Sequence, residues 1–214
     1  ATVLYTSGTT GDPKGVMLSH RNLLMNAYYG GQRQNFSDSE RVCIPVPFYH
    51  CFGCVIGTLM TAVYGGAMVI PAESFEPGAT LDAVTQENCT VLYGVPTMFS
   101  AQVNHPDFEK YELTTLRTGM MAGSPCPTEL MKRVYHEMHM TEITIGFGQT
   151  ETSPIITLSR TTDSMETRVS TVGFPLPGVE VRIVDPETLE DVLQGEQGEF
   201  WAKGHCIMLG YYKN

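Results

Sequence analysis

Short apolar runs alternate with helical patterns along most of this chain, and this alternation constrains the fold more than any other feature. The first apolar runs, at residues 2–6 and 16–18, precede a helical pattern that Ser19 can cap and that the Gly30–Gly31 pair is expected to end. Strand-then-helix order is typical of parallel strands joined by crossover helices. The sequence therefore predicts an α/β fold with a parallel sheet and crossover helices.

The same order repeats up to Pro154, where the pattern changes. The further strands expected before Pro154 cover residues 41–46, 67–70, 90–93, 116–122 and 142–147, and the further helices cover residues 52–64, 80–88, 97–103 and 128–138. Beyond it, strand-like segments at residues 155–158, 179–185 and 199–203 are separated by glycines and prolines. We expect a strand-rich, antiparallel or barrel-like portion there, within one domain that is incomplete at both ends.

Residues 42–72 contain no Asp, Glu, Lys or Arg, and a stretch of this length could form a transmembrane helix. Proline and glycine decide against that alternative, because they interrupt the stretch repeatedly. They stand at Pro45, Pro47, Gly65, Gly66 and Pro71. A strand, a helix and a second strand in a buried core fit better, so no transmembrane segment is expected.

The charge balance and the cysteines limit the classes of binding partner and the cellular compartment that we expect. The formal net charge is -10 and the 13 Lys and Arg residues are scattered, so we expect no surface for nucleic acid or an anionic membrane. The six cysteines form no evenly spaced framework, which favours buried thiols in a reducing, intracellular compartment. Cys51 and Cys54 form a C-x-x-C pair, but without a second pair, packing explains them better than a zinc or redox site.

The strongest chemical signal is the segment at residues 6–15, which reads Thr-Ser-Gly-Thr-Thr-Gly-Asp-Pro-Lys-Gly and directly follows a strand. Glycine lets backbone N–H groups approach anionic oxygens, hydroxyl groups donate hydrogen bonds without charge, and Lys14 supplies a mobile cation. These properties suit a polyphosphate, and a plain glycine-rich turn is the simpler alternative. A Walker loop is disfavoured because it needs Gly-Lys followed by Ser or Thr, whereas Pro13 precedes and Gly15 follows this lysine.

This loop closely resembles the signature loop of the adenylate-forming superfamily, which includes acyl-CoA synthetases, luciferases and nonribosomal peptide adenylation domains. The resemblance implies that residues 1–214 belong to the large N-terminal AMP-binding domain of such an enzyme, with its small C-terminal domain absent. It also implies that the phosphates of ATP contact the loop through Thr6, Ser7, Gly8, Thr9, Thr10, Gly11, Asp12, Pro13 and Lys14.

Residues 122–125 and 146–151 resemble two further landmarks of the superfamily, in the family's order. The first reads Ala-Gly-Ser-Pro, and the resemblance implies that adenine lies over this turn, although a simple strand-to-helix turn is the structural alternative. The second reads Gly-Phe-Gly-Gln-Thr-Glu and follows an expected strand, at the end where open α/β sheets bind ligands. The adenine contacts implied are Ala122, Gly123, Ser124, Phe147 and Gly148.

The second landmark also implies roles for two polar residues. Thr150 would donate to the α-phosphate, and Glu151 would help to hold Mg²⁺, a hard ion that prefers oxygen ligands. The family usually has Tyr at position 147, and Phe keeps the ring while losing the hydroxyl. Residues 48–53, Phe-Tyr-His-Cys-Phe-Gly, resemble the family's carboxylate pocket. An acyl pocket formed by His50 and Gly146 is therefore implied, and a structural role for His50 stays equally open.

The resemblance implies that a carboxylate attacks the α-phosphorus of Mg-ATP to give an acyl-adenylate and pyrophosphate, and that coenzyme A then displaces AMP. Lys14, Thr150 and Glu151 would be the catalytic residues, acting by alignment and charge stabilisation. The family's ribose-binding aspartate and the lysine of its C-terminal domain are missing from this sequence. We therefore expect that this piece does not turn over alone and that the missing domain is its partner.

Residues 47–51, 93–99 and 204–211 look most like acyl-CoA synthetase family member two, a group of medium-chain fatty acid ligases, which suggests a mitochondrial location. Residues 172–178, 198–204 and 210–211 resemble scaffold of the large domain. Two alternatives remain: a truncated, non-catalytic nucleotide-binding or interaction module, and a P-loop NTPase, which Gly15 disfavours. The module would bind ATP without product, and the NTPase would release ADP and phosphate.

Overall fold

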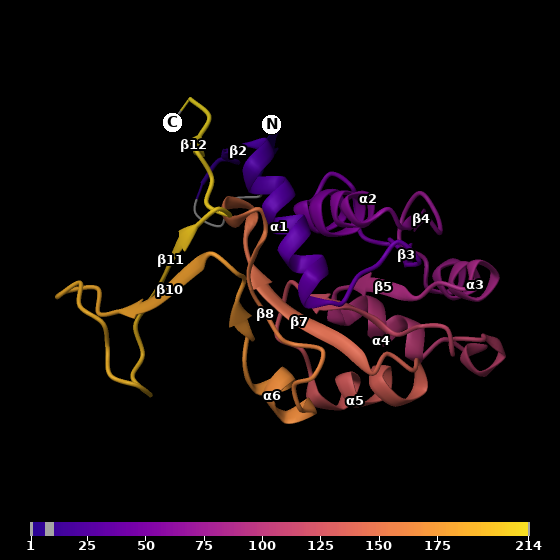
Figure 1. The fold of residues 1–214 in the computed structure, drawn as a ribbon. Helices are drawn as coiled ribbons and strands as arrows, with labels where there is room; N and C mark the ends of the chain where they lie inside the picture. Colours follow the sequence, from indigo (N-terminus) through magenta and orange to yellow (C-terminus); the bar gives the residue numbers. More distant parts are fainter. Residues whose placement is uncertain (1, 7–10, 214) are drawn as a thin grey trace.

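The computed structural model describes residues 2–6 and 11–213, and within them the central sheet has seven strands (Figure 1). Their spatial order is β4-β3-β5-β6-β7-β8-β9. The bounds are β3 (Arg41–Cys43), β4 (Ala67–Val69), β5 (Val91–Gly94), β6 (Thr118–Ala122), β7 (Glu142–Gly148), β8 (Ile155–Leu158) and β9 (Phe174–Pro175). The first five in this order pair in parallel, which confirms the expected sheet, and β8 and β9 add antiparallel strands at one edge.

Helices cover both faces of this sheet (Figure 1). One face carries α1 (His20–Arg33), the π-helical segment η1 (Phe52–Leu59) and α2 (Met60–Tyr64). The other face carries α3 (Pro77–Glu87), α4 (Pro96–Val103) and α5 (Thr128–Glu137), with α6 (Met165–Ser170) beside α5. Two short 3₁₀ turns are η2 (Phe108–Lys110) and η3 (Thr150–Thr152).

The other strands form two small antiparallel sheets. β1 (Thr2–Tyr5) pairs with β2 (Gly15–Leu18), which also pairs with β12 (Gly210–Tyr211). β10 (Val179–Val184) and β11 (Glu199–Gly204) form a separate hairpin. The named strands that follow Pro154 therefore all pair antiparallel, as the change of pattern at this proline predicts.

The uncharged stretch at residues 42–72 folds as expected into the end of β3, the helical unit η1–α2, and β4. Among residues 2–6 and 11–213, none of the helices has the length and hydropathy that a membrane crossing requires.

The predicted end of α1 is wrong, because the helix passes through the Gly30–Gly31 pair and continues to Arg33. A Cβ added at Gly30 would lie 2.6 Å from the Met60 methyl carbon, and one added at Gly31 would lie 2.4 Å from a ring carbon of Tyr64. The two glycines therefore allow α1 to approach the η1–α2 unit closely instead of ending the helix.

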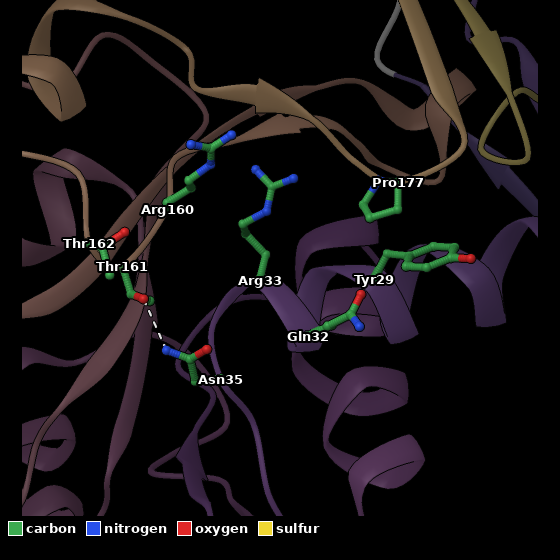
Figure 2. Close-up of a pocket in the computed structure, with 8 residues that line it drawn as sticks. All are labelled: Tyr29, Gln32, Arg33, Asn35, Arg160, Thr161, Thr162 and Pro177. Carbon is green, nitrogen blue, oxygen red and sulfur yellow. Dashed lines mark hydrogen bonds between the residues drawn. The ribbon is translucent and has the colours of Figure 1, made fainter.

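The last turn of α1 borders a hollow of about 320 Å³, shown in Figure 2. Arg33 donates hydrogen bonds to the carbonyl oxygens of Leu158 (2.7 Å) and Pro175 (2.9 Å), and the Arg160 guanidinium lies 4.0 Å from the centroid of the Phe174 ring. Burial, and then the charge of Arg160, lower the pKa of Arg33. Among residues 2–6 and 11–213, none of the site residues predicted from the sequence lines this hollow.

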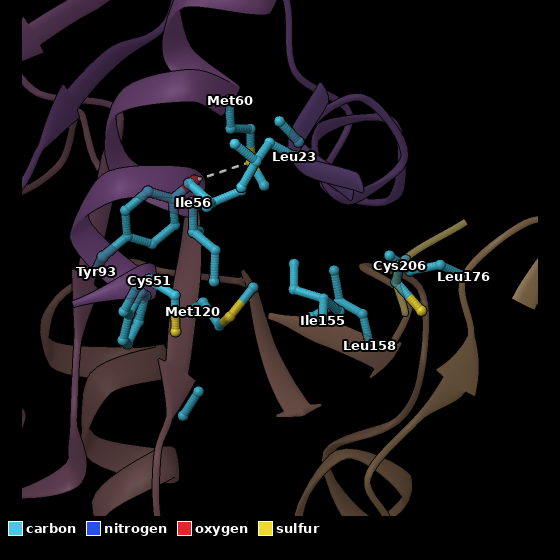
Figure 3. Packing of buried hydrophobic residues seen from close by; sticks show 14 of the residues in the cluster. Leu23, Cys51, Ile56, Met60, Tyr93, Met120, Ile155, Leu158, Leu176 and Cys206 are labelled. Carbon is cyan, nitrogen blue, oxygen red and sulfur yellow. Dashed lines mark hydrogen bonds between the residues drawn. The ribbon is translucent and has the colours of Figure 1, made fainter. Parts of the chain in front are cut away.

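Two hydrophobic cores lie on opposite faces of the sheet, because successive side chains of a strand point to opposite sides. Tyr93 and Met120 belong to the core beneath α1 and α2, where the Tyr93 hydroxyl lies 3.3 Å from the sulfur of Met60 (Figure 3). Their neighbours Leu92 and Met121 belong to the core beneath α3, α4 and α5. Strands buried on both faces need continuous apolar runs, which is why the parallel strands lack an alternating pattern.

Candidate active site

Two segments for which adenine contact is expected lie side by side at the carboxyl ends of β6 and β7. Ala122, the last residue of β6, pairs in register with Gly146 of β7. The turns that leave these strands therefore begin at the same edge of the sheet. Open α/β sheets bind ligands at this edge, so the fold unites two motifs that are far apart in the sequence.

Two glycines shape this edge. Gly123 has a φ of +90°, in the left-handed region that side chains rarely adopt, and Ser124 follows it on the surface. At Gly148 an added Cβ would lie 1.7 Å from the carbonyl oxygen of Pro154, so the backbone that enters β8 can approach only a glycine. Both glycines are exposed, which leaves their backbone groups accessible to a ligand.

Phe147 presents a partly free aromatic ring beside these glycines. The side chain is 40% exposed. Its ring packs edge-on against Phe200 of β11, with the centroids 5.2 Å apart and the planes at 70°. The β10–β11 hairpin thus supports the ring, and its exposed part can stack on a planar base.

Thr150 and Glu151 lie in a short turn that a buried threonine holds together. Thr152 Oγ1 accepts a hydrogen bond from the backbone N–H of Gln149 (3.1 Å) and donates one to the carbonyl oxygen of Pro154 (2.7 Å). These bonds close the chain between β7 and β8. The turn therefore holds Thr150 and Glu151 at the carboxyl end of β7.

His50 and Cys51 lie next to this turn. Cys51 Sγ is 3.8 Å from Thr150 Oγ1. His50 Nδ1 accepts a hydrogen bond from the backbone N–H of Phe52 (3.1 Å), which requires an unprotonated Nδ1. Desolvation lowers the pKa of His50, and burial raises the pKa of Cys51 to about 11. The bond to Phe52 is a structural role for His50 at the start of η1, and its acyl contact stays a prediction.

Glu151 and Lys14 both contact Tyr211, a residue that the sequence pattern assigns to the scaffold. The Tyr211 hydroxyl donates a hydrogen bond to Glu151 Oε1 (2.8 Å), and the Lys14 ammonium lies 5.1 Å from the centroid of the Tyr211 ring. The bond to the carboxylate raises the pKa of Tyr211, so the hydroxyl stays protonated. The carbonyl oxygen of Glu151 also accepts the N–H of Met208 (2.9 Å).

The predicted phosphate loop is the connection of the β1–β2 hairpin. Tyr5 pairs with Gly15, and the N–H of Thr6 donates to the carbonyl oxygen of Lys14 (3.0 Å). The next predicted contacts, Gly11, Asp12, Pro13 and Lys14, are exposed. The remaining ones, Ser7, Gly8, Thr9 and Thr10, lie outside the described residues.

Two buried asparagines attach α1 to the rest of the site, and no motif in the sequence identifies them. Asn26 Nδ2 donates to the carbonyl oxygen of Ile155 (2.7 Å), and its Oδ1 accepts the N–H of the same residue (3.1 Å). Asn22 Nδ2 donates to the carbonyl oxygens of His205 (2.6 Å) and Ile207 (2.9 Å). The only signal that could have found them is the presence of two amides on the apolar face of the helix.

The side chains around Glu151 fit a magnesium ion held mainly by a nucleotide. Glu151 Oε1 accepts the Tyr211 hydroxyl, and Oε2 has no hydrogen bond or ion pair to another described residue. No group of three or more His, Cys, Asp or Glu side chains among the described residues could hold a metal ion. Mg²⁺ typically takes one or two carboxylates together with phosphate oxygens and water, so one glutamate is sufficient.

Comparison with known sequences identifies related enzymes. The sequence profile of the family described as AMP-binding enzyme matches residues 1–212. YngI of Bacillus subtilis, which is named as an acyl-CoA synthetase, is 54% identical over 98% of this chain and 38% of its own length. The Danio rerio protein named medium-chain acyl-CoA ligase ACSF2, mitochondrial, is 43% identical over 99% of this chain and 35% of its own length. The chain therefore spans little more than a third of these relatives.

Solved structures of similar fold include two with a bound nucleotide or acyl-adenylate. ATP-bound MatB from Rhodopseudomonas palustris has a TM-score of 0.86 and 30% identity, over 99% of this chain and 41% of that chain. The anthranilate CoA ligase AuaEII in complex with anthranoyl-AMP has a TM-score of 0.90 and 25% identity, over 99% of this chain and 40% of that chain. The predicted fold class and the resemblance to adenylate-forming enzymes are thereby confirmed.

Proposed function

Because this chain belongs to the AMP-binding enzyme family, we propose that the full-length protein is an ATP-dependent acid–thiol ligase that converts a carboxylic acid into its coenzyme A thioester. The observation that carries the proposal is the meeting of Lys14 and Glu151 at Tyr211, next to the paired ends of β6 and β7. The relatives named as acyl-CoA synthetase or ligase favour transfer of the acyl group to coenzyme A over other reactions of an acyl-adenylate.

In the first step, a carboxylate oxygen attacks the α-phosphorus of ATP, the bond between that phosphorus and the bridging oxygen breaks, and pyrophosphate leaves. In the second, the sulfur of coenzyme A attacks the acyl carbon, AMP leaves with the electron pair of the C–O bond, and the thiol proton goes to solvent. No protein nucleophile is needed, because catalysis consists of aligning the anionic reactants and stabilising their charge.

Each site residue has a defined part in this reaction. The loop at residues 6–14, of which residues 11–14 are exposed, holds the phosphates, with Lys14 as its cation. Thr150 donates to the α-phosphate, and adenine lies between Phe147 and the turn at residues 122–124. Glu151 helps to hold Mg²⁺, which neutralises phosphate charge when bound. His50 and Gly146 line the acyl pocket.

A medium-chain fatty acid and a mitochondrial location are the finer parts of the proposal. Their support is the likeness to the ligase ACSF2, which is named as medium-chain and mitochondrial. The bacterial protein YngI is more similar to this chain (54% identity) than ACSF2 is (43%), and its name states no compartment. We also propose that residues 1–214 form part of the adenylation domain and that the rest of the full-length protein completes it.

The test is carboxylate-dependent ATP–pyrophosphate exchange by the full-length protein, with short-, medium- and long-chain fatty acids. We expect exchange that is fastest with medium-chain acids, and AMP with acyl-CoA once coenzyme A is added. The 214-residue chain should give no exchange above background. Release of ADP and phosphate, or ATP binding without any product, would refute the ligase. Exchange by the isolated chain at a full-length rate would refute its dependence on the rest of the protein.

A further inference from the structure

Tyr211 is the point at which three distant segments of the site meet. As part of β12 it pairs with Val16 of β2, the strand that leaves the phosphate loop. Its hydroxyl donates to Glu151, 60 positions earlier in the chain, and its ring lies beneath the Lys14 ammonium. A small shift of β12 would therefore change the surroundings of both charged residues.

The hydroxyl restrains the carboxylate that is expected to hold the metal ion. A carboxylate has two acceptor oxygens, and a donor fixed on one of them limits rotation of the whole group. Here the donor occupies Oε1 at 2.8 Å, while Oε2 has no hydrogen bond or ion pair to any other described residue. Outer donors of this kind typically change metal affinity or activity about 10- to 100-fold when they are removed.

The ring separates two opposite charges. Lys14 contacts the face of the ring and Glu151 contacts the hydroxyl at its edge, and the two side chains form no salt bridge in the described part of the chain. A direct ion pair between Lys14 and Glu151 would engage both the lysine that is expected to bind phosphate and the carboxylate that is expected to bind the metal. Attraction to the ring gives the ammonium a weaker partner that an anionic ligand can replace.

We propose that Tyr211 is a positioning residue, which orients Glu151 toward the magnesium–nucleotide complex and prevents Lys14 from pairing with Glu151. This inference rests on the proposed function only in its assignment of an ATP site. The two can be tested apart, because metal binding is measurable without turnover.

The first experiment compares the full-length protein with its Tyr211→Phe variant, which keeps the ring and removes the hydroxyl. Mn²⁺ binding in the presence of a non-hydrolysable ATP analogue is measured by electron paramagnetic resonance, and analogue binding without metal is measured by calorimetry. We expect Mn²⁺ to bind about 10-fold more weakly, and binding of the metal-free analogue to stay within about 2-fold, since the ring still holds Lys14.

Tyr212→Phe is the matched control, because it removes the same atom one residue away. The Tyr212 hydroxyl has no hydrogen-bond partner among residues 2–6 and 11–213, and the residue contacts the loop through its backbone N–H to the carbonyl oxygen of Gly15 (2.7 Å). This variant should bind Mn²⁺ as the unmodified protein does. Equal weakening in both variants would overturn the inference.

A double-mutant cycle with Glu151→Ala decides whether Tyr211 acts through Glu151. In the Glu151→Ala background, Tyr211→Phe should cause no further loss of Mn²⁺ affinity. Additive losses would assign Tyr211 a purely structural role, including the case in which Tyr211→Phe disturbs the fold. If the unmodified protein forms no pyrophosphate but the cycle is non-additive, the proposed function fails and the positioning role stands. If it forms pyrophosphate and Tyr211→Phe binds Mn²⁺ normally, the positioning role fails alone.

Discussion

The thiol of Cys51 lies 3.8 Å from the hydroxyl of Thr150, within the candidate active site. Its side chain is 3% exposed, and burial raises its pKa to about 11, with contacts such as the Thr150 hydroxyl opposing the rise only in part. The thiolate is the reactive form of cysteine. Cys51 therefore fills space beside Thr150 as a neutral group, which agrees with a reaction that needs no protein nucleophile.

We predict that Cys51 resists alkylation until the pH approaches about 11. At pH 8 its thiolate fraction should be about 100-fold below that of a thiol of ordinary pKa. Iodoacetamide labelling across a pH series, followed by peptide mapping, measures this. In urea all six cysteines should react alike. Fast labelling of Cys51 in the folded protein at pH 7.5 would contradict the assignment.

Helix α1 contributes both to the packing of the fold and to the placement of segments at the site. Its N-cap residue Ser19 accepts the N–H of Asn22 (3.1 Å), as the sequence predicts. Gly30 and Gly31 then pack against α2. The amide of Asn26 bonds to the first residue of β8, and that of Asn22 bonds to the segment before β12. The helix that follows the phosphate loop is thus fixed by packing on one side and by hydrogen bonds on another.

We predict that Gly31→Ala destabilises the protein, although alanine favours helices by about 1 kcal/mol over glycine. The new Cβ would lie 2.4 Å from the Tyr64 ring, which cannot move freely because its hydroxyl donates to the carbonyl oxygen of Tyr28 (2.6 Å). Overpacking of this kind costs about 1–3 kcal/mol. We therefore expect the cost of overpacking to exceed the gain in helix propensity. Urea unfolding followed by circular dichroism should show a lower free energy of unfolding.

The control for this prediction is Gln32→Ala, an exposed position on the same turn of α1. This variant also introduces alanine, but without a clash. Its free energy of unfolding should stay within about 0.5 kcal/mol of that of the unmodified protein. A Gly31→Ala variant as stable as this control would show that the contact between α1 and α2 is loose.

The whole molecule combines a doubly covered sheet with small antiparallel units at its side (Figure 1). Every residue of β6 is buried, with β5 and β7 on either side. The β10–β11 hairpin has only two strands and several exposed residues in each. A two-stranded unit is marginally stable without further packing. Phe200, which supports the Phe147 ring, therefore lies in the less stable part of the molecule.

We predict that native-state hydrogen exchange separates these two parts. Amides of β6 should exchange only through global unfolding, whereas those of the hairpin should open locally, with protection lower by at least about 100-fold. Mass spectrometry of peptides covering residues 118–122 and 199–204 would measure the difference. Equal protection in the two peptides would mean that the hairpin and the sheet open as one unit.

The sequence by itself determined the α/β class, the approximate place of most helices and strands, and the chemistry of the motifs. Strand and helix periods are properties of neighbouring residues, and so are the residue types that suit a phosphate or a magnesium ion. The break at Pro154 and the strand–helix–strand order of residues 42–72 were readable for the same reason. The ligand contacts assigned to the site residues, from Thr6 in the phosphate loop to Glu151 after β7, all stay predictions.

Only the tertiary structure decided which distant residues meet. The bond from Tyr211 to Glu151 joins positions 60 apart, and the pairing of Asn26 with Ile155 joins positions 129 apart. Such contacts depend on strand order and register, which local periodicity does not encode. The same applies to Gly30 and Gly31, since a glycine that ends a helix and one that permits close packing look alike until the opposing side chain is known.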